Sequence, residues 1–140
     1  MASTRNLFRV PRRRAPMEEL QEVRVIENSG LAGCAHARPG GKRQVLLMDI
    51  ETLRAMELVP GIARENITTE GLDVNGLQIG QRLNAGEVEL QVSAVCEPCE
   101  LMEEICAGLM HKLQGRRGML CRVVRGGTLK RGDAIESQQA

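Results

Sequence analysis

Residues 87–99, EVELQVSAVCEPC, decide the fold because they join the clearest strand of the chain to its longest helical pattern. Apolar and polar side chains alternate over residues 88–94, as in a strand with one buried face. From residue 101 to 113 an apolar side chain recurs every fourth position, which predicts a helix over residues 98–113. Pro98 suits the first position of that helix, where a backbone N–H has no partner. We therefore expect a strand that changes to a helix between Cys96 and Cys99.

Most of the remaining elements are expected to be short strands separated by turns. Apolar patterns predict further strands at residues 22–25, 44–48 and 119–124, and shorter ones within 64–83 and 129–135. Asp49 is suited to cap a short helix over residues 50–57, and Gly126-Gly127 is expected to close a hairpin. Many short strands with Gly-rich turns predict a mainly β fold: a closed or nearly closed β-barrel of mostly antiparallel strands, with two or three helices.

The composition limits the partners. The chain has 140 residues, the size of one domain, and Phe8 is its only aromatic residue, which excludes an aromatic stacking platform for single-stranded nucleic acid. Residues 18–140 carry 14 basic and 18 acidic side chains, so general nucleic-acid binding is not expected. No apolar run approaches the ~20 residues of a membrane span, and no signal peptide is recognisable. The five irregularly spaced cysteines indicate a reducing, cytoplasmic location.

Residues 1–17 differ from the rest because they contain five arginines and no acidic side chain. We expect them to form a disordered basic tail, and residues 18–140 to form the folded domain. Phe8 would then lie outside the core, which would consist of Leu, Val, Ile, Met and Ala. A mitochondrial presequence and a contact with acidic partners are alternative interpretations of this stretch.

Cys99 is the candidate catalytic or metal-binding residue. In the first turn of a helix, the free backbone N–H groups and the helix dipole favour a thiolate. Glu97 and Glu100 oppose the ionisation of Cys99, and Arg116 and Arg117 would offset these acids if their loop folds back. The alternative is that Cys99 is a small apolar residue of the core.

The Cys96-x-x-Cys99 spacing also permits a zinc site. Cys34 and His36 would supply two further ligands, which defines a zinc-stabilised interaction module without catalysis as one alternative function. The Cys34-x-His36 spacing is tighter than that of most zinc sites. A thioredoxin-like redox motif would require a parallel βαβ unit, whereas these strands look antiparallel.

A series of short motifs occurs along the chain in a recognisable order. The motifs are Leu31-Ala32-Gly33-Cys34-Ala35-His36-Ala37, Arg43-Gln44-Val45, Pro60-Gly61, Glu65-Asn66-Ile67-Thr68, Leu77-x-Ile79-Gly80, Pro98-Cys99, Gly115-x-x-Gly118, Arg122-Val123-Val124 and Gly132-Asp133. The series resembles the MOSC domain, named for the C-terminal domain of molybdenum cofactor sulfurases, over about residues 20–136. The family has a β-barrel with a few helices.

The resemblance implies that the chain binds the pterin-based molybdenum cofactor. It implies that Cys99 ligates molybdenum or carries sulfur as a persulfide, and that His36, Arg43, Asn66 and Arg117 bind the cofactor. Arginines suit a phosphate, and a soft thiolate suits molybdenum. The chain departs from the family at Cys34, where an Asp usually follows the Gly, and at Gln81, where an Asp is also common.

The leading hypothesis is therefore a cofactor-binding or sulfur-carrier module whose partner is a molybdoenzyme or sulfurase protein. Larger relatives carry additional domains, so a partner or a second copy is expected to complete the pocket. Whether the chain is itself an enzyme stays open at this point. The alternative is a small molybdoenzyme that reduces N-hydroxylated compounds with an electron-transfer partner.

Overall fold

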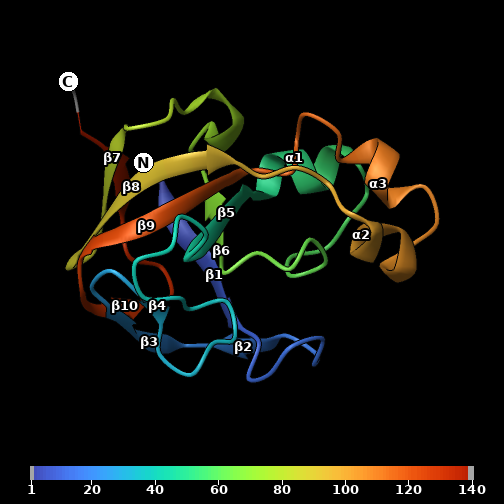
Figure 1. The fold of residues 1–140 in the computed structure, drawn as a ribbon. Coiled ribbons are helices and arrows are strands. Elements are labelled where there is room, and N and C mark those ends of the chain that lie inside the picture. Colours follow the sequence, from blue (N-terminus) through green and yellow to red (C-terminus); the bar gives the residue numbers. More distant parts are fainter. Residues whose placement is uncertain (1, 139–140) are drawn as a thin grey trace.

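In the computed structural model, residues 2–138 are described, and they form two β-sheets and three short α-helices (Figure 1). The strands are β1 (Ser3–Arg9), β2 (Glu18–Leu20), β3 (Glu22–Ile26), β4 (Gly30–Leu31), β5 (Val45–Asp49), β6 (Ile67–Glu70), β7 (Arg82–Ala85), β8 (Val88–Val95), β9 (Met119–Arg125), β10 (Gly127–Lys130) and β11 (Ile135–Ser137). The helices are α1 (Ile50–Ala55), α2 (Glu100–Ile105) and α3 (Leu109–Lys112), with a 3-10 turn at Val74–Gly76.

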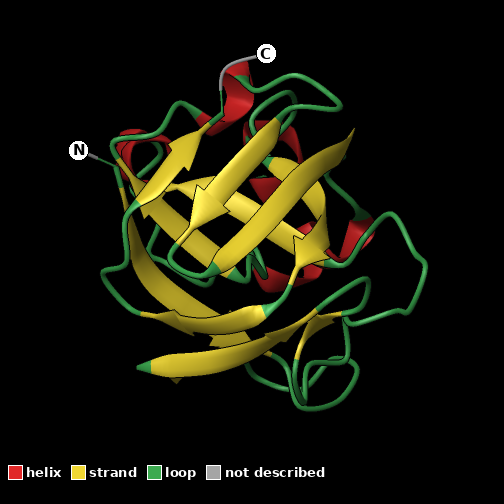
Figure 2. Cartoon of the chain, turned by 90° about the vertical axis from the view of Figure 1, so that its left-hand side faces the viewer, coloured by secondary structure: helices red, strands yellow, loops and turns green. Residues whose placement is uncertain are grey.

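The larger sheet has the strand order β11-β7-β8-β9-β5-β6-β1-β2, and the smaller sheet has the order β10-β3-β4. Strands, drawn in yellow, make up most of the cartoon in Figure 2. Only β5 and β6 pair in parallel among the described strands, so the predicted mainly β, mostly antiparallel fold is confirmed. The predicted closed barrel is not confirmed. Within residues 2–138 the larger sheet ends at β11 and β2, so it is not a closed barrel. One isolated bridge, between Ser3 in β1 and Ala134 just before β11, joins the two segments without closing the sheet.

The prediction of a disordered tail is wrong for residues 3–9. These residues form β1, which lies inside the larger sheet and pairs with β6 on one side and β2 on the other. Leu7 is fully buried and Phe8 is nearly so, and the ring of Phe8 packs against Gly61. The arginine-rich composition concealed this strand, because Arg9 reaches outward to an ion pair with Glu18 while its apolar neighbours face inward.

The single helix predicted over residues 98–113 is also wrong. The chain instead forms α2 and α3, which are separated at Gly108 (φ +84°). Cys99 is the N-cap of α2 rather than part of its first turn. Asp49 caps α1 as predicted, because its carboxylate accepts a hydrogen bond from the backbone N–H of Thr52 (3.0 Å).

The predicted hairpin at Gly126-Gly127 is a crossover between the two sheets. β9 pairs with β5 and β8, whereas β10 pairs with β3, so the chain leaves the larger sheet at this point. A side chain at Gly126 would meet the carbonyl oxygen of Val25 at 2.5 Å, which explains the glycine.

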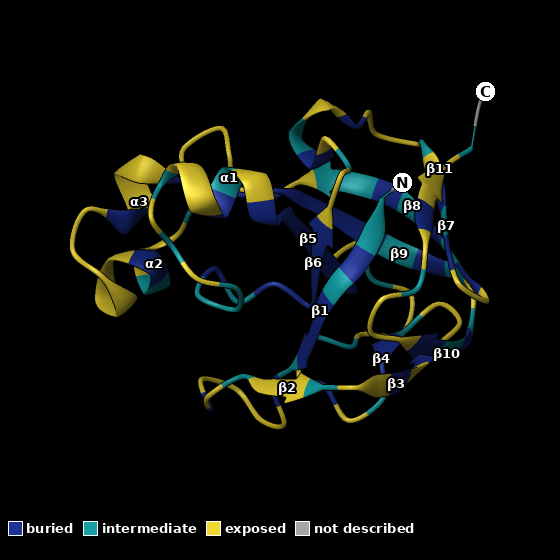
Figure 3. Ribbon diagram, turned by 180° about the vertical axis from the view of Figure 1, so that it is seen from behind, coloured by how far each residue is buried: buried dark blue, intermediate teal, exposed yellow. Residues whose placement is uncertain are grey.

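Two apolar cores and a small third cluster of Leu46, Cys96 and Leu120 hold these layers together within the described residues. The larger core lies among the strands and consists mainly of Leu, Val and Ile, as the composition requires. The smaller core lies under the three helices and includes Met48, Leu53, Met102 and Leu109. The outer surfaces of α2 and α3 are exposed (Figure 3). None of the helices described in residues 2–138 has the length and apolar character needed to cross a lipid bilayer.

Candidate functional site

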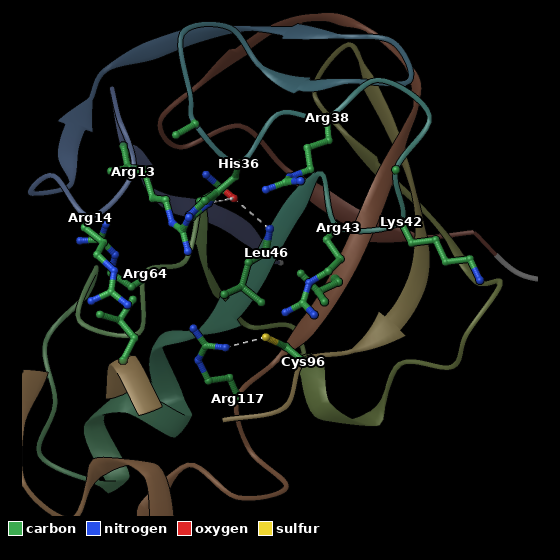
Figure 4. A pocket seen from close by; sticks show the side chains of 16 residues that line it. Arg13, Arg14, His36, Arg38, Lys42, Arg43, Leu46, Arg64, Cys96 and Arg117 are labelled. Carbon is green, nitrogen blue, oxygen red and sulfur yellow. Dashed lines mark hydrogen bonds between the residues drawn. The ribbon is translucent and has the colours of Figure 1, made fainter. Parts of the chain in front are cut away.

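A cavity of about 820 Å³ lies where the β1–β2 loop, the loop before β5, the segment before β6 and the turn before β9 meet (Figure 4). Among the described residues that line it, none is Asp or Glu. Seven are Arg or Lys: Arg13, Arg14, Arg38, Lys42, Arg43, Arg64 and Arg117. Such a concentration of one sign of charge, with Leu46 on the cavity wall, attracts anions.

Arg117 is the most buried of these cations, with 6% of its surface exposed. It donates hydrogen bonds to Sγ of Cys96 (2.7 Å) and to the backbone oxygens of Ala63 (2.9 Å) and Glu97 (3.3 Å). Its Nε has no hydrogen-bond partner within residues 2–138. A side chain at the next residue, Gly118 (φ +90°), would collide with the carbonyl oxygen of Leu47, so this turn requires glycine.

Asn66 is fully buried and joins three parts of the cavity wall. Its Oδ1 accepts a hydrogen bond from the backbone N–H of Leu46 (3.0 Å) and lies 3.4 Å from Nδ1 of His36. Its Nδ2 donates to the carbonyl oxygen of Phe8 (3.2 Å) and to Sγ of Cys34 (3.4 Å). The side chain of Asn66 therefore links β1, β5 and the loop that carries His36.

Cys34 is buried, two residues before His36 in the same loop. Burial raises the pKa of its thiol, but hydrogen bonds from the side chain of His36 and from the backbone of Val10 outweigh this effect and lower the pKa from 9.0 to about 7. A substantial fraction of Cys34 is therefore ionised near neutral pH, at the position where the sequence resemblance anticipates an Asp.

We expect a thiolate absorbance step near pH 7 when the folded protein is titrated, since the pKa of Cys34 is about 7. Cys34→Ser should remove this step. Cys121→Ser should leave it unchanged, because complete burial raises the pKa of Cys121 to about 12. The lowered pKa of Cys34 stabilises the fold fully above pH 9, and this contribution disappears as the pH falls to 7. An unchanged step in Cys34→Ser would contradict the assignment.

The two cysteines of the Cys-x-x-Cys pair lie in different environments. Cys96 is buried and lines the cavity, whereas Cys99 is exposed and is not among the lining residues. Burial raises the pKa of Cys96, although the charges of Arg117 and Arg43 oppose this effect. The neighbouring charges of Cys99 and Glu97 add to the rise in the pKa of Cys96. The role of Cys99 stays a prediction.

The other four predicted site residues come together in one cavity. His36, Arg43, Asn66 and Arg117 line it although they are spread over 82 positions of the sequence. Sequence reasoning named Cys96 only as a zinc ligand, and it did not identify four further lining arginines, Arg13, Arg14, Arg38 and Arg64. The absence of acids among residues 1–17 is the sequence signal for Arg13 and Arg14, and the strand at residues 3–9 brings them to the cavity instead of leaving them in a disordered tail.

The zinc-stabilised alternative is not supported by the geometry. It requires Cys34, His36, Cys96 and Cys99 to converge on one point. Within residues 2–138, no group of three or more His, Cys, Asp or Glu side chains is placed to hold a metal ion. Cys34 contacts Asn66 instead, and Cys96 contacts Arg117.

The mixed sheet and its cavity define a mainly β protein with a positively charged cavity. The MOSC domain family model matches residues 40–136, and the chain belongs to this family. None of the curated proteins matches the chain.

Solved structures share the fold. The YUAD protein from Bacillus subtilis has a TM-score of 0.83 at 19% identity, and the match covers 98% of this chain and 96% of that one. YiiM from Geobacillus stearothermophilus has a TM-score of 0.82 at 17% identity, covering 99% of this chain and 76% of that one. YiiM from Escherichia coli has a TM-score of 0.73 at 19% identity, covering 100% and 71%. At these identities the likeness concerns the fold alone.

Proposed function

We propose that this chain binds the molybdenum cofactor, a phosphate-bearing pterin, in the cation-lined cavity. The observation that carries the proposal is a cavity with seven Arg or Lys side chains and no carboxylate among its described lining residues, in a MOSC domain. A volume of about 820 Å³ lies within the range of small-molecule sites. Five of the seven cations are exposed, and with no carboxylate among the described lining residues the positive potential of the cavity favours an anionic ligand.

Each wall of the cavity suits a different part of such a ligand. Arg43 and Arg117 would hold the phosphate, since guanidinium groups bind phosphate oxygens in pairs. Leu46 would contact the flat ring system, and His36 would offer its ring to polar ring atoms. The bound cofactor would supply a molybdenum centre for redox chemistry, and the nearby sulfurs of Cys96 and Cys99 are soft donors suited to it.

The test compares protein purified from a host that makes the cofactor. Molybdenum and pterin are measured per chain in the wild type, in Arg43→Glu and in Arg24→Glu. Arg24 is an exposed arginine on β3 and does not line the cavity, so it is the matched control. We expect both quantities to fall about tenfold or more in Arg43→Glu only. Wild-type protein without molybdenum and pterin would refute the proposal.

The proposal extends to Cys99 as the sulfur carrier or metal ligand. Cys106 is the matched control because it is the other exposed cysteine among the described residues. Labile sulfur and molybdenum are measured in Cys99→Ala and Cys106→Ala. Loss of labile sulfur or molybdenum in Cys99→Ala, but not in Cys106→Ala, would support this role. Equal content in both variants would remove Cys99 from the mechanism, and Cys96→Ala would then be examined, because Cys96 lines the cavity.

A further inference from the structure

We propose that Cys34 is a peroxide-sensitive thiol, which hydrogen peroxide oxidises reversibly to a sulfenic acid with the help of His36 and Asn66. The reaction is separate from the proposed binding of the cofactor, because Cys34 is not among the residues that line the cavity. Cys34 would give the protein a redox-sensitive site of its own.

The first argument is the set of hydrogen-bond donors around Sγ of Cys34. Nδ2 of Asn66 donates to this sulfur at 3.4 Å. The side chain of His36 and the backbone N–H groups of Val10 and His36 also form hydrogen bonds with it. Several donors directed at one sulfur stabilise the thiolate, which is the form of cysteine that attacks an oxidant. A cysteine that only filled space in the core would need none of them.

The second argument is the arrangement of Cys34, His36 and Asn66 relative to one another. Oδ1 of Asn66 lies 3.4 Å from Nδ1 of His36, while Nδ2 of the same amide contacts Sγ of Cys34. A nucleophile, a base within hydrogen-bond reach and a third group that orients the base are the parts of an activated cysteine. Arg64 adds a positive charge that interacts with the thiolate of Cys34, and its Nε is buried without a partner within residues 2–138.

The third argument is that the other four cysteines lie in different environments. Complete burial raises the pKa of Cys121 to about 12, and burial also raises the pKa of Cys96. Cys99 caps α2 without a hydrogen bond from its side chain, and Sγ of Cys106 donates a hydrogen bond rather than accepting one. At Cys34 the donors outweigh the effect of burial and lower the pKa to about 7.

The reaction needs one peroxide and one group that moves a proton. The imidazole of His36 takes the proton of the Cys34 thiol, and the thiolate attacks one oxygen of hydrogen peroxide. An S–O bond forms as the O–O bond breaks, so the sulfur loses two electrons and the peroxide gains them. The departing hydroxide takes the proton from His36 and leaves as water. Cys34 is 7% exposed, which suits an oxidant of two oxygen atoms better than a bulky reagent.

The experiment treats folded wild-type protein at neutral pH with hydrogen peroxide and dimedone, which traps sulfenic acids, and measures the label at each cysteine by peptide mass spectrometry. We expect Cys34 to be labelled about threefold or more faster than Cys99 and Cys106, because its larger thiolate fraction outweighs the lower nucleophilicity of that thiolate. A bulky maleimide should show the reverse order, since Cys99 and Cys106 are exposed and Cys34 is buried. Unfolding in urea should remove the preference of peroxide for Cys34. Without dimedone, a reducing thiol should restore the free cysteine.

The variant that tests the mechanism is His36→Gln, which we expect to slow the labelling of Cys34 about threefold or more. His111→Gln is the matched control, because His111 is the other histidine of the chain and is exposed on α3. Peroxide labelling of Cys99 or Cys106 as fast as that of Cys34 would overturn the inference. So would an unchanged rate in His36→Gln. Selective oxidation of Cys34 in protein without molybdenum or pterin would support this site while rejecting the proposed cofactor.

Discussion

Asn66→Ala is expected to lower the free energy of unfolding by about 3–5 kcal/mol, because each buried backbone group left without a partner costs about 1–3 kcal/mol. The amide of Asn66 is fully buried and bonds the backbone N–H of Leu46 and the carbonyl oxygen of Phe8. Alanine would leave both groups without this partner and would open a small void. Urea unfolding measures the effect, and we expect the dependence of the unfolding free energy on urea concentration to be the same in the wild type and the variant.

The control for this substitution is Asn84→Ala in β7, where the amide is only partly buried and accepts one hydrogen bond, from Gln138. We expect a loss of about 1 kcal/mol or less there. Asn66→Asp separates the two halves of the amide, since it keeps the acceptor for Leu46 but removes the donors to Phe8 and Cys34. If Asn66→Ala and Asn84→Ala lose equal stability, Asn66 does not hold the cavity wall together.

Arg117→Met is expected to abolish retention of the cofactor and to destabilise the fold by about 2–4 kcal/mol. Methionine preserves much of the buried volume, but it cannot donate to the carbonyl oxygens of Ala63 and Glu97. The pKa of Cys96 should rise further, because the positive charge of Arg117 stabilises its thiolate. Metal analysis, thermal unfolding and thiol titration measure the three effects.

The neighbouring Arg116 is the matched control, since it is exposed and does not line the cavity. Arg116→Met should retain both cofactor and stability. Arg117→Lys keeps the positive charge but loses the planar set of donors. Compared with Arg117→Met, we therefore expect it to recover most of the attraction for anions but little of the lost stability. Normal molybdenum content in Arg117→Met would exclude Arg117 from the binding site.

Local patterns predicted the elements whose formation depends on their own residues. The alternation over residues 88–94 produced β8, and Asp49 caps α1 through a contact only three residues away. The same reasoning failed for residues 3–9, because β1 exists through pairing with β6, some 60 positions later. It also failed for residues 98–113, since Gly108 adopts a left-handed conformation that ends the apparent helical repeat.

The sequence by itself determined the mainly β class, the family through its ordered motifs, and four of the residues that line the cavity. Only the tertiary structure decided that Arg13, Arg14, Arg38 and Arg64 join them, and that Cys96 rather than Cys99 lines the cavity. The physical reason is distance along the chain. Strand alternation and helix capping depend on residues that are close in the sequence. The cavity is made by segments that meet only after the sheets have formed, so the packing of the sheets decides which charged side chains and which thiol line it.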